Sequence, residues 1–219
     1  VYFSKEDFPA ALEWFDRAIA VEPNSETAHR YRADALMRLK RIDEAGNGYV
    51  NAFVAAPFAP VPTEALNSWV KKRNLTLHRT NSSFIAGRIR IVNGAPNIVI
   101  DGNQINAPSM AYLLGRTAYL TKHKISAAHY QNSLAEEAAG IRSAVQTMTE
   151  VSGRTRTDQK LEPFAKEMDA ITRLDRDGLL EAFILLDRPT TSIMDSYPGY
   201  RESHRDELVR YIRKVWLRL

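Results

Sequence analysis

Apolar residues recur along most of the chain at the three- and four-residue spacing of an amphipathic helix, which predicts a mainly α-helical protein. The segment near 178–187 is apolar almost all round, so we expect it at the centre of a helical bundle. The last helical segment contains Pro198-Gly199, which predicts a kink or a restart there. The pattern predicts helices near residues 26–39, 42–55, 63–74, 108–122, 126–151, 161–174, 178–187 and 193–219.

A different pattern, alternation with a period of two, covers residues 84–100. It predicts one β-hairpin with Ile85, Ile89 and Ile91 facing the core and the intervening arginines facing outward. Asn93-Gly94 is typical of the turn between two strands, and the second strand is expected at 97–100. Pro96 beside the turn is expected to limit the pairing.

Five positions near the N-terminus repeat at a spacing of 34 residues, and this is the strongest signal in the chain. Phe8, Ala11, Phe15, Ala18 and Pro23 reappear as Ile42, Ala45, Tyr49, Ala52 and Pro57. The pattern describes a pair of helices in each repeat. Small alanines allow close approach, a ring fills the gap between the helices, and the proline ends the second helix.

This pattern resembles the tetratricopeptide repeat, whose signature includes A-x3-F followed by a proline at the helix end. The resemblance covers residues 1–59 and departs from the family at His29 and Arg32, where the first helix would carry Trp and Leu. Gly46 and Gly48 in the second helix are a further departure. Each glycine costs about 1 kcal/mol of helix propensity relative to alanine.

The resemblance implies an α-α solenoid fragment with a concave groove, lined by the first helix of each repeat, for a peptide or protein partner. By this analogy the partner-binding side chains are Thr27, Arg30, Asp34, Met37 and Arg38. The alternative is that these residues form only the polar face of an amphipathic helix. Asp34 would repel a peptide carboxylate, which argues against binding of chaperone tails.

The domains are expected at 1–75, TPR-like repeats with a capping helix, and at 76–219, a helical bundle with the hairpin. Pro57, Pro60 and Pro62 predict a stiff connector, after which Thr63 begins the capping helix. Trp69 on that helix is interpreted as a core residue rather than as a ring that stacks on a ligand.

Composition narrows the possible functions. The chain has 219 residues, of which 44% are hydrophobic and 26% charged, and it has no cysteine. It therefore has no disulfide and no thiolate metal site, and no apolar run reaches the length of a membrane span. The net charge of +4 comes from the middle of the chain, where no aromatic residues alternate with the cations. We therefore expect no nucleic-acid partner. These cations are Lys71, Lys72, Arg73, Arg79, Arg88 and Arg90.

No known catalytic motif is found, so the sequence predicts no catalytic residue, no cofactor and no metal. A metal site built from His123 and His129 with Glu136 or Glu137 is the weaker interpretation, and surface histidines are favoured. Glu181 lies in the most apolar helix. It is either a buried acid paired with an arginine such as Arg188 or the one position of that helix that faces solvent.

Two functions follow from these observations. The first is a non-catalytic protein–protein interaction module of the TPR type. The second is the C-terminal accessory part of a larger enzyme, such as a hydrolase, with its catalytic region upstream. Because the chain starts with Val1 inside a repeat, we expect that sequence is missing before it. The compartment, cytoplasmic or exported, and the oligomeric state are left open.

Overall fold

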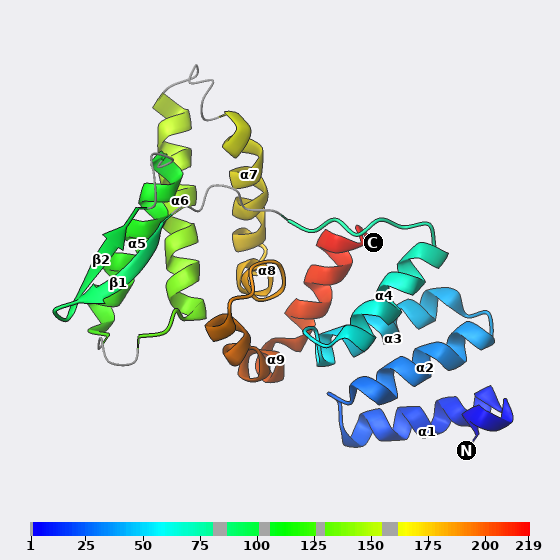
Figure 1. Cartoon of the computed structure of the whole chain (residues 1–219). Helices are drawn as coiled ribbons and strands as arrows, with labels where there is room; N and C mark the ends of the chain where they lie inside the picture. The colour runs from blue at the N-terminus through cyan, green and yellow to red at the C-terminus, as the bar shows by residue number, and fades with distance from the viewer. Residues whose placement is uncertain (1, 81–86, 101–105, 126–129, 155–161) are drawn as a thin grey trace. The chain divides into compact units, whose positions relative to one another are not determined.

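The computed structural model describes residues 2–80, 87–100, 106–125, 130–154 and 162–219 (Figure 1). These residues are mainly helical and include one small two-stranded antiparallel sheet, which confirms the mainly α prediction and the single hairpin. The chain forms two compact units. The first combines Val1–Arg79 with Tyr200–Leu219, and the second is Thr80–Gly199.

Four helices that follow one another in sequence make up most of the first unit (Figure 1). Each packs against the next, and α2 also contacts α4. A 3-10 turn, Phe3–Lys5, precedes them. The helices are α1 (Phe8–Val21), α2 (Glu26–Arg38), α3 (Ile42–Ala55) and α4 (Pro60–Lys72).

The 34-residue period of the sequence is also present in the backbone. Helices α1 and α3 begin 34 positions apart, as do α2 and α4, and the helices of each pair have equal lengths. The second residue after each of α2 and α4 has a left-handed backbone conformation. These residues are Lys40 (φ 64°) and Asn74 (φ 52°). The next residue, Arg41 or Leu75, donates its N–H back to the helix in both cases. The period thus extends beyond residue 59, through the whole of α4.

The two glycines of α3 allow its neighbours to approach closely. A Cβ atom at Gly46 would lie 2.2 Å from the indole of Trp69 on α4. A Cβ atom at Gly48 would lie 2.8 Å from the Cβ of Ala33 on α2. The propensity lost at these positions is therefore offset by close packing on both sides of α3.

Helix α4 begins earlier than the sequence predicts. Pro60 and Pro62 lie in its first turn, where a proline lacks only an N–H that the helix would leave unbonded anyway. The expected stiff connector is thus wrong for these two prolines. Trp69 is 3% exposed, as expected for a core residue, and its Nε1 donates to the carbonyl of Ile42 at 2.8 Å.

The C-terminal helix completes the first unit through two arginines. Arg205 donates to the side chain of Asn24 at 2.5 Å and to that of Asn51 at 3.0 Å. Arg201 donates to the carbonyl of Ala55 at the end of α3. The compact units therefore differ from the expected domains 1–75 and 76–219, because residues 200–219 contact α2 and α3.

The terminal helix α9 (Thr191–Tyr211) bends at a different place from the one predicted. Its helical geometry is interrupted at His204 (φ −132°, ψ 29°), whereas Pro198 lies inside a continuous helical stretch. The expected break at Pro198-Gly199 is therefore wrong. A π-helical turn, Ile212–Trp216, follows the helix and buries the ring of Trp216 against Phe53.

The hairpin of the second unit has the expected turn, and the arginines of its first strand are exposed as expected. Strand β1 (Arg88–Val92) pairs with β2 (Ala95–Val99), and Asn93 and Gly94 have positive φ as a type I′ turn requires. Ile89 is buried, but Ile85 lies outside the described residues. The second strand starts at Ala95, earlier than expected. Pro96 pairs with Ile91 at a position where its missing N–H would point away from β1, so it does not limit the pairing.

The helices of the second unit are α5 (Ala107–His123), α6 (Leu134–Arg154), α7 (Glu162–Arg176), α8 (Leu180–Asp187) and the start of α9. The hairpin packs on α5, which packs on α6, and α8 contacts both α6 and α7. Five consecutive residues of α8, 182–186, are buried, which confirms its central place. Helix α6 starts later than predicted, where Ser133 Oγ accepts from the N–H of Glu136 at 3.2 Å.

Candidate functional site

A pocket of about 390 Å³ lies on the first unit, where α2 and α4 run beside α3. Helices α2 and α4 each contribute three of the lining residues. Helix α3 and the N-terminal turn each contribute one aromatic ring. The described residues that line the pocket are Phe3, Asp34, Met37, Arg38, Tyr49, Ser68, Trp69 and Lys72.

Three of the five predicted partner-binding residues line this pocket, namely Asp34, Met37 and Arg38. The other two are not among the lining residues and use their polar groups within α2. Arg30 donates to Glu26 at 2.7 Å and its guanidinium lies 4.5 Å from the ring centre of Tyr31. Thr27 is exposed, and its hydroxyl donates to the same Glu26 at 3.1 Å.

The carboxylate of Asp34 has a hydrogen-bond partner inside the pocket. Tyr49 Oη donates to Asp34 Oδ1 at 2.6 Å. Burial raises the pKa of the Tyr49 hydroxyl, and the hydrogen bond to Asp34 raises it further, so the phenol keeps its proton at neutral pH. Asp34 is thereby fixed against α3, and part of its charge is offset by this donor.

Sequence reasoning missed the α4 side of the pocket, although the repeat contains the signal that finds it. Ser68 is 34 positions after Asp34, and Lys72 is 34 positions after Arg38. Adding the period to the two predicted residues of α2 therefore gives two lining residues of α4. Trp69, next to Ser68, also lines the pocket. Its indole packs against Gly46 and donates a hydrogen bond to the carbonyl of Ile42, which fixes the position of the ring.

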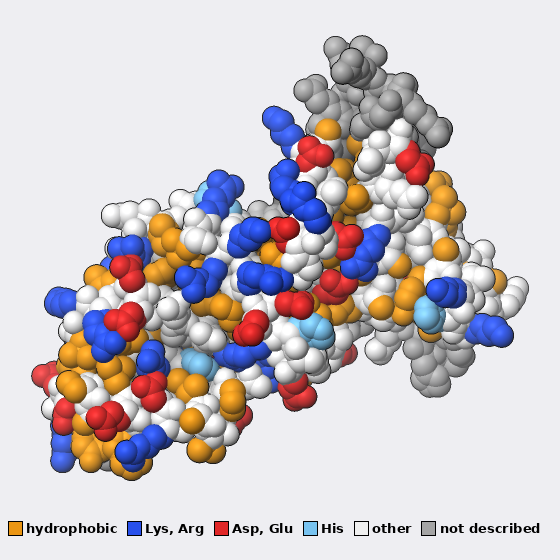
Figure 2. All heavy atoms as spheres, turned by 180° about the vertical axis from the view of Figure 1, so that it is seen from behind, with side chains coloured by type: hydrophobic (Ala, Val, Ile, Leu, Met, Phe, Trp, Pro, Cys, Tyr) orange, Lys and Arg blue, Asp and Glu red, His pale blue; other side chains and the backbone are white. Residues whose placement is uncertain are grey.

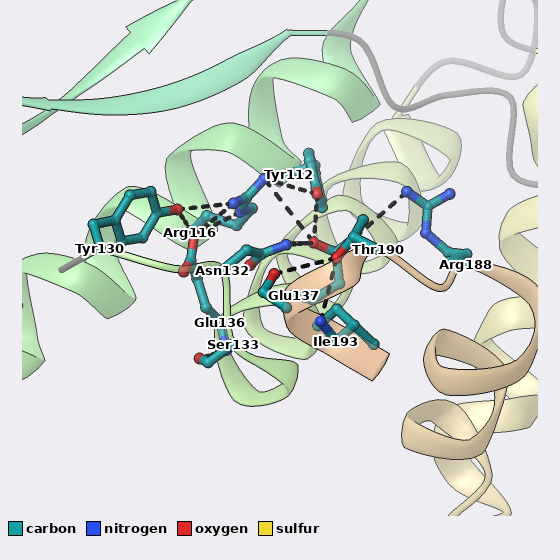
Figure 3. A network of polar contacts seen from close by, with 11 residues as sticks. Tyr112, Arg116, Tyr130, Asn132, Ser133, Glu136, Glu137, Arg188, Thr190 and Ile193 are labelled. Atoms are coloured by element: carbon teal, nitrogen blue, oxygen red, sulfur yellow. Dashed lines mark hydrogen bonds and ion pairs between the residues drawn. The ribbon is translucent and has the colours of Figure 1, made fainter. Parts of the chain in front are cut away.

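The second unit contains a buried polar cluster, in which Arg116 of α5 is the central residue (Figure 3). Its guanidinium donates to Glu136 at 2.8 Å and to the hydroxyls of Tyr112 and Tyr130 at 3.0 Å each. Arg116 is 7% exposed and Glu136 is 1% exposed, so this pairing occurs away from water.

The neighbouring carboxylate, Glu137, has its own donors. Tyr112 donates to it at 2.7 Å, Asn132 at 3.0 Å and Arg188 at 3.4 Å. Burial raises the pKa of Tyr112 and of Tyr130, and the negatively charged carboxylates that accept hydrogen bonds from their hydroxyls raise it further. The cluster thus joins α5, the start of α6 and the residue after α8, which is a structural role.

The contacts of Glu136 and Glu181 bear on the alternatives that the sequence left open for these two residues. Glu136 and Glu137 are held by arginine and tyrosine donors. The ring of His123 lies against that of Tyr119 with ring centres 4.2 Å apart, and His129 lies outside the described residues. Among the described residues, no three potential metal ligands gather in one place. Glu181 is at the solvent-facing side of α8, where its carboxylate pairs with Arg142 at 2.8 Å. Arg188 pairs with Glu137 and not with Glu181.

The cations of the chain's middle are divided between the units. Four lie in the first unit, where Arg73 pairs with Asp43 at 2.8 Å and Arg79 lies 4.1 Å from the ring centre of Trp216. Arg88 and Arg90 lie on β1 in the second unit. The six cations are therefore not adjacent along one element. On the face of the molecule drawn in Figure 2, Lys and Arg side chains are interspersed with Asp and Glu side chains.

Comparison with known proteins adds no relative: no family model, no curated protein and no solved structure matches this chain. Within the described part of the chain, none of the helices combines the length and the apolar character needed to cross a bilayer.

Proposed function

We propose that the chain is a non-catalytic interaction module of the tetratricopeptide type, which binds a partner protein in the pocket between α2 and α4. The observation that carries this proposal is the position of the pocket. Its walls come from α2, which the resemblance assigns to the groove, and from α4, which occupies the equivalent position 34 residues later.

The backbone supports the same assignment. The pairs α1–α2 and α3–α4 share helix lengths, the left-handed residue after α2 and α4, and the hydrogen bond that follows it. Repeats of this kind present side chains at equivalent positions along one surface, which suits a partner that contacts several helices in turn.

The lining is suited to contact with a peptide. The pocket is at the small end of the range for ligand sites, so it admits one or two side chains rather than a whole helix. Met37 and Phe3 offer partly exposed apolar surface, and Arg38, Lys72 and Ser68 offer polar groups around it.

The test is selection of random displayed peptides on the immobilised chain, followed by affinity measurement on two matched variants. Ser68→Trp fills the pocket. Asn67→Trp adds the same ring at the exposed neighbouring residue, which is not among the lining residues. We expect peptides whose Kd rises more than about tenfold, or about 1.4 kcal/mol, with Ser68→Trp and changes little with Asn67→Trp.

Selected peptides that bind both variants equally would place binding outside the pocket and would contradict the proposal. A selection that enriches no peptide would contradict it as well. Unchanged far-ultraviolet circular dichroism and a cooperative urea unfolding transition would show that each variant remains folded.

A further inference from the structure

The pocket carries an excess of positive charge that its own residues do not neutralise. Arg38 and Lys72 are exposed, and no other described residue forms an ion pair or a hydrogen bond with either side chain. The single carboxylate among the described lining residues, Asp34, already accepts a hydrogen bond from Tyr49. The lining therefore carries the two positive charges of Arg38 and Lys72 against the one negative charge of Asp34, and the groups of the two cations are available to a ligand.

The repeat accounts for this arrangement. Arg38 and Lys72 occupy equivalent positions, 34 residues apart, each at the last residue of its helix. Equivalent positions of two packed repeats lie along the same surface, so the period brings the two cations to one pocket.

Other cations of the same region are used differently. Arg30 pairs with Glu26, Arg41 pairs with Glu44 at 2.6 Å, and Arg73 pairs with Asp43. These three arginines lie outside the lining of this pocket. Both cations that line the pocket are without a described partner, whereas the three arginines with ion pairs lie outside it.

We infer that the partner of this pocket is an extended acidic segment of another protein, with a Glu or Asp side chain placed between Arg38 and Lys72. An apolar side chain next to this acid would cover Met37 and Phe3. This inference rests on the proposed function and specifies the chemistry of its ligand.

The simpler explanation is that both cations only offset the helix dipole at the ends of α2 and α4. Under that explanation their charge affects stability and not binding. Charge reversal separates the two explanations, because it changes the sign of the pocket.

The experiment uses peptides selected on the wild-type chain and a double variant, Arg38→Glu with Lys72→Glu. The matched control is Lys40→Glu with Lys71→Glu, which makes the same change of net charge at exposed residues outside the lining. We expect the selected peptides to be acidic. Their Kd should rise more than about tenfold with the first variant and less than about threefold with the control.

Neutral or basic peptides that are still blocked by Ser68→Trp would overturn the inference and leave the proposed function standing. Acidic peptides that bind the Arg38→Glu, Lys72→Glu variant as tightly as wild type would also overturn the inference. If no enriched peptide is blocked by Ser68→Trp, the proposed function fails together with the inference.

Selection repeated on the charge-reversed variant gives an independent result. We expect that selection to enrich basic peptides, because the pocket then carries two added carboxylates beside Asp34. Enrichment of the same acidic peptides on both chains would overturn the inference.

Discussion

The two compact units differ in what they bury. The interfaces that α3 makes with α2 and α4 in the first unit are mainly apolar and closely packed, and Gly46, Gly48 and Ala33 let these helices approach. The second unit instead buries an arginine between two glutamates and two tyrosines. The hydrophobic effect holds the first type of interface with little demand on direction, whereas the second needs each donor to meet its acceptor.

This difference governs how each unit tolerates substitution. In the first unit a small increase in volume is the harmful change. In the second, the harmful change is removal of one member of the polar cluster, because a buried charge is then left without a partner.

The largest effect is expected for Arg116→Met. The variant leaves the buried carboxylate of Glu136 without its cation, so we expect a loss of about 3–5 kcal/mol in the free energy of unfolding. Urea denaturation followed by circular dichroism measures it. The control is Arg142→Met, whose partners Asp175 and Glu181 are at the surface, and about 1 kcal/mol or less is expected there. Equal losses in the two variants would contradict the structural role of the cluster.

Gly46→Ala tests the close packing of the first unit. The added Cβ would overlap the ring of Trp69, and we expect a loss of about 1–3 kcal/mol despite the better helix propensity of alanine. Trp14, Trp69 and Trp216 all lie in this unit, so tryptophan fluorescence during denaturation reports on it selectively. Gly199→Ala, with open space around its Cβ, should be neutral or stabilising when unfolding is followed by circular dichroism, which also reports on the second unit that contains Gly199. A stabilised Gly46→Ala variant would contradict the packing argument.

The pH dependence of the first unit should carry the signature of His29. This ring is 8% exposed, its Nε2 lies 2.9 Å from the carbonyl of Pro23, and Arg205 is 3.3 Å from the same nitrogen. Burial lowers the pKa of His29, and the nearby Arg205 lowers it further. The unfolded chain therefore binds this proton at higher pH than the folded one, so stability falls as pH drops below about 6.5.

Denaturation at pH 7.5 and at pH 5, followed by tryptophan fluorescence, measures this loss, expected at up to about 1.4 kcal/mol per pH unit. His29→Gln keeps a donor for the Pro23 carbonyl but removes the titration, so its stability should change less between the two pH values. A loss on acidification that is equal in wild type and variant would show that another group is responsible.

The smallest effect on stability is expected for Arg38→Gln combined with Lys72→Gln. Both side chains are exposed and neither has a described polar partner, so the free energy of unfolding should change by about 0.5 kcal/mol or less. Denaturation monitored by tryptophan fluorescence is the measurement. A loss above about 1 kcal/mol would indicate that these cations mainly stabilise the helix ends.

The sequence predicts the helices of the first unit well because a period can be read locally. Positions 8–55 repeat their small and aromatic residues, and the helix bounds at 26–38 and 42–55 agree with expectation to within a residue. The exceptions are the starting residues of α4 and α6, where the sequence allows two positions and packing selects one. Pro60 and Pro62 can either interrupt a helix or begin one, and Ser126 is as good a cap as Ser133. Membership of the tetratricopeptide family stays a prediction.

The candidate site was predicted in part for the same reason. Asp34, Met37 and Arg38 follow from the position of α2 within the repeat, and Lys72 would have followed from the period itself. The hydrogen bond from Tyr49 to Asp34 could not be predicted, because it depends on how deeply α3 sits beside α2. The cluster around Arg116 has no period at all, since its members are brought together only by the packing of α5, α6 and α8.

The discontinuity of the first unit has a consequence for how the protein folds during synthesis. Arg201 and Arg205 reach partners 146 and 181 positions earlier in the chain. The ribosome therefore releases α1–α4 and then the entire second unit before the segment that completes the first unit exists. Closing so long a loop costs entropy and slows folding, so we expect the docking of residues 200–219 to be the late step of the first unit's assembly.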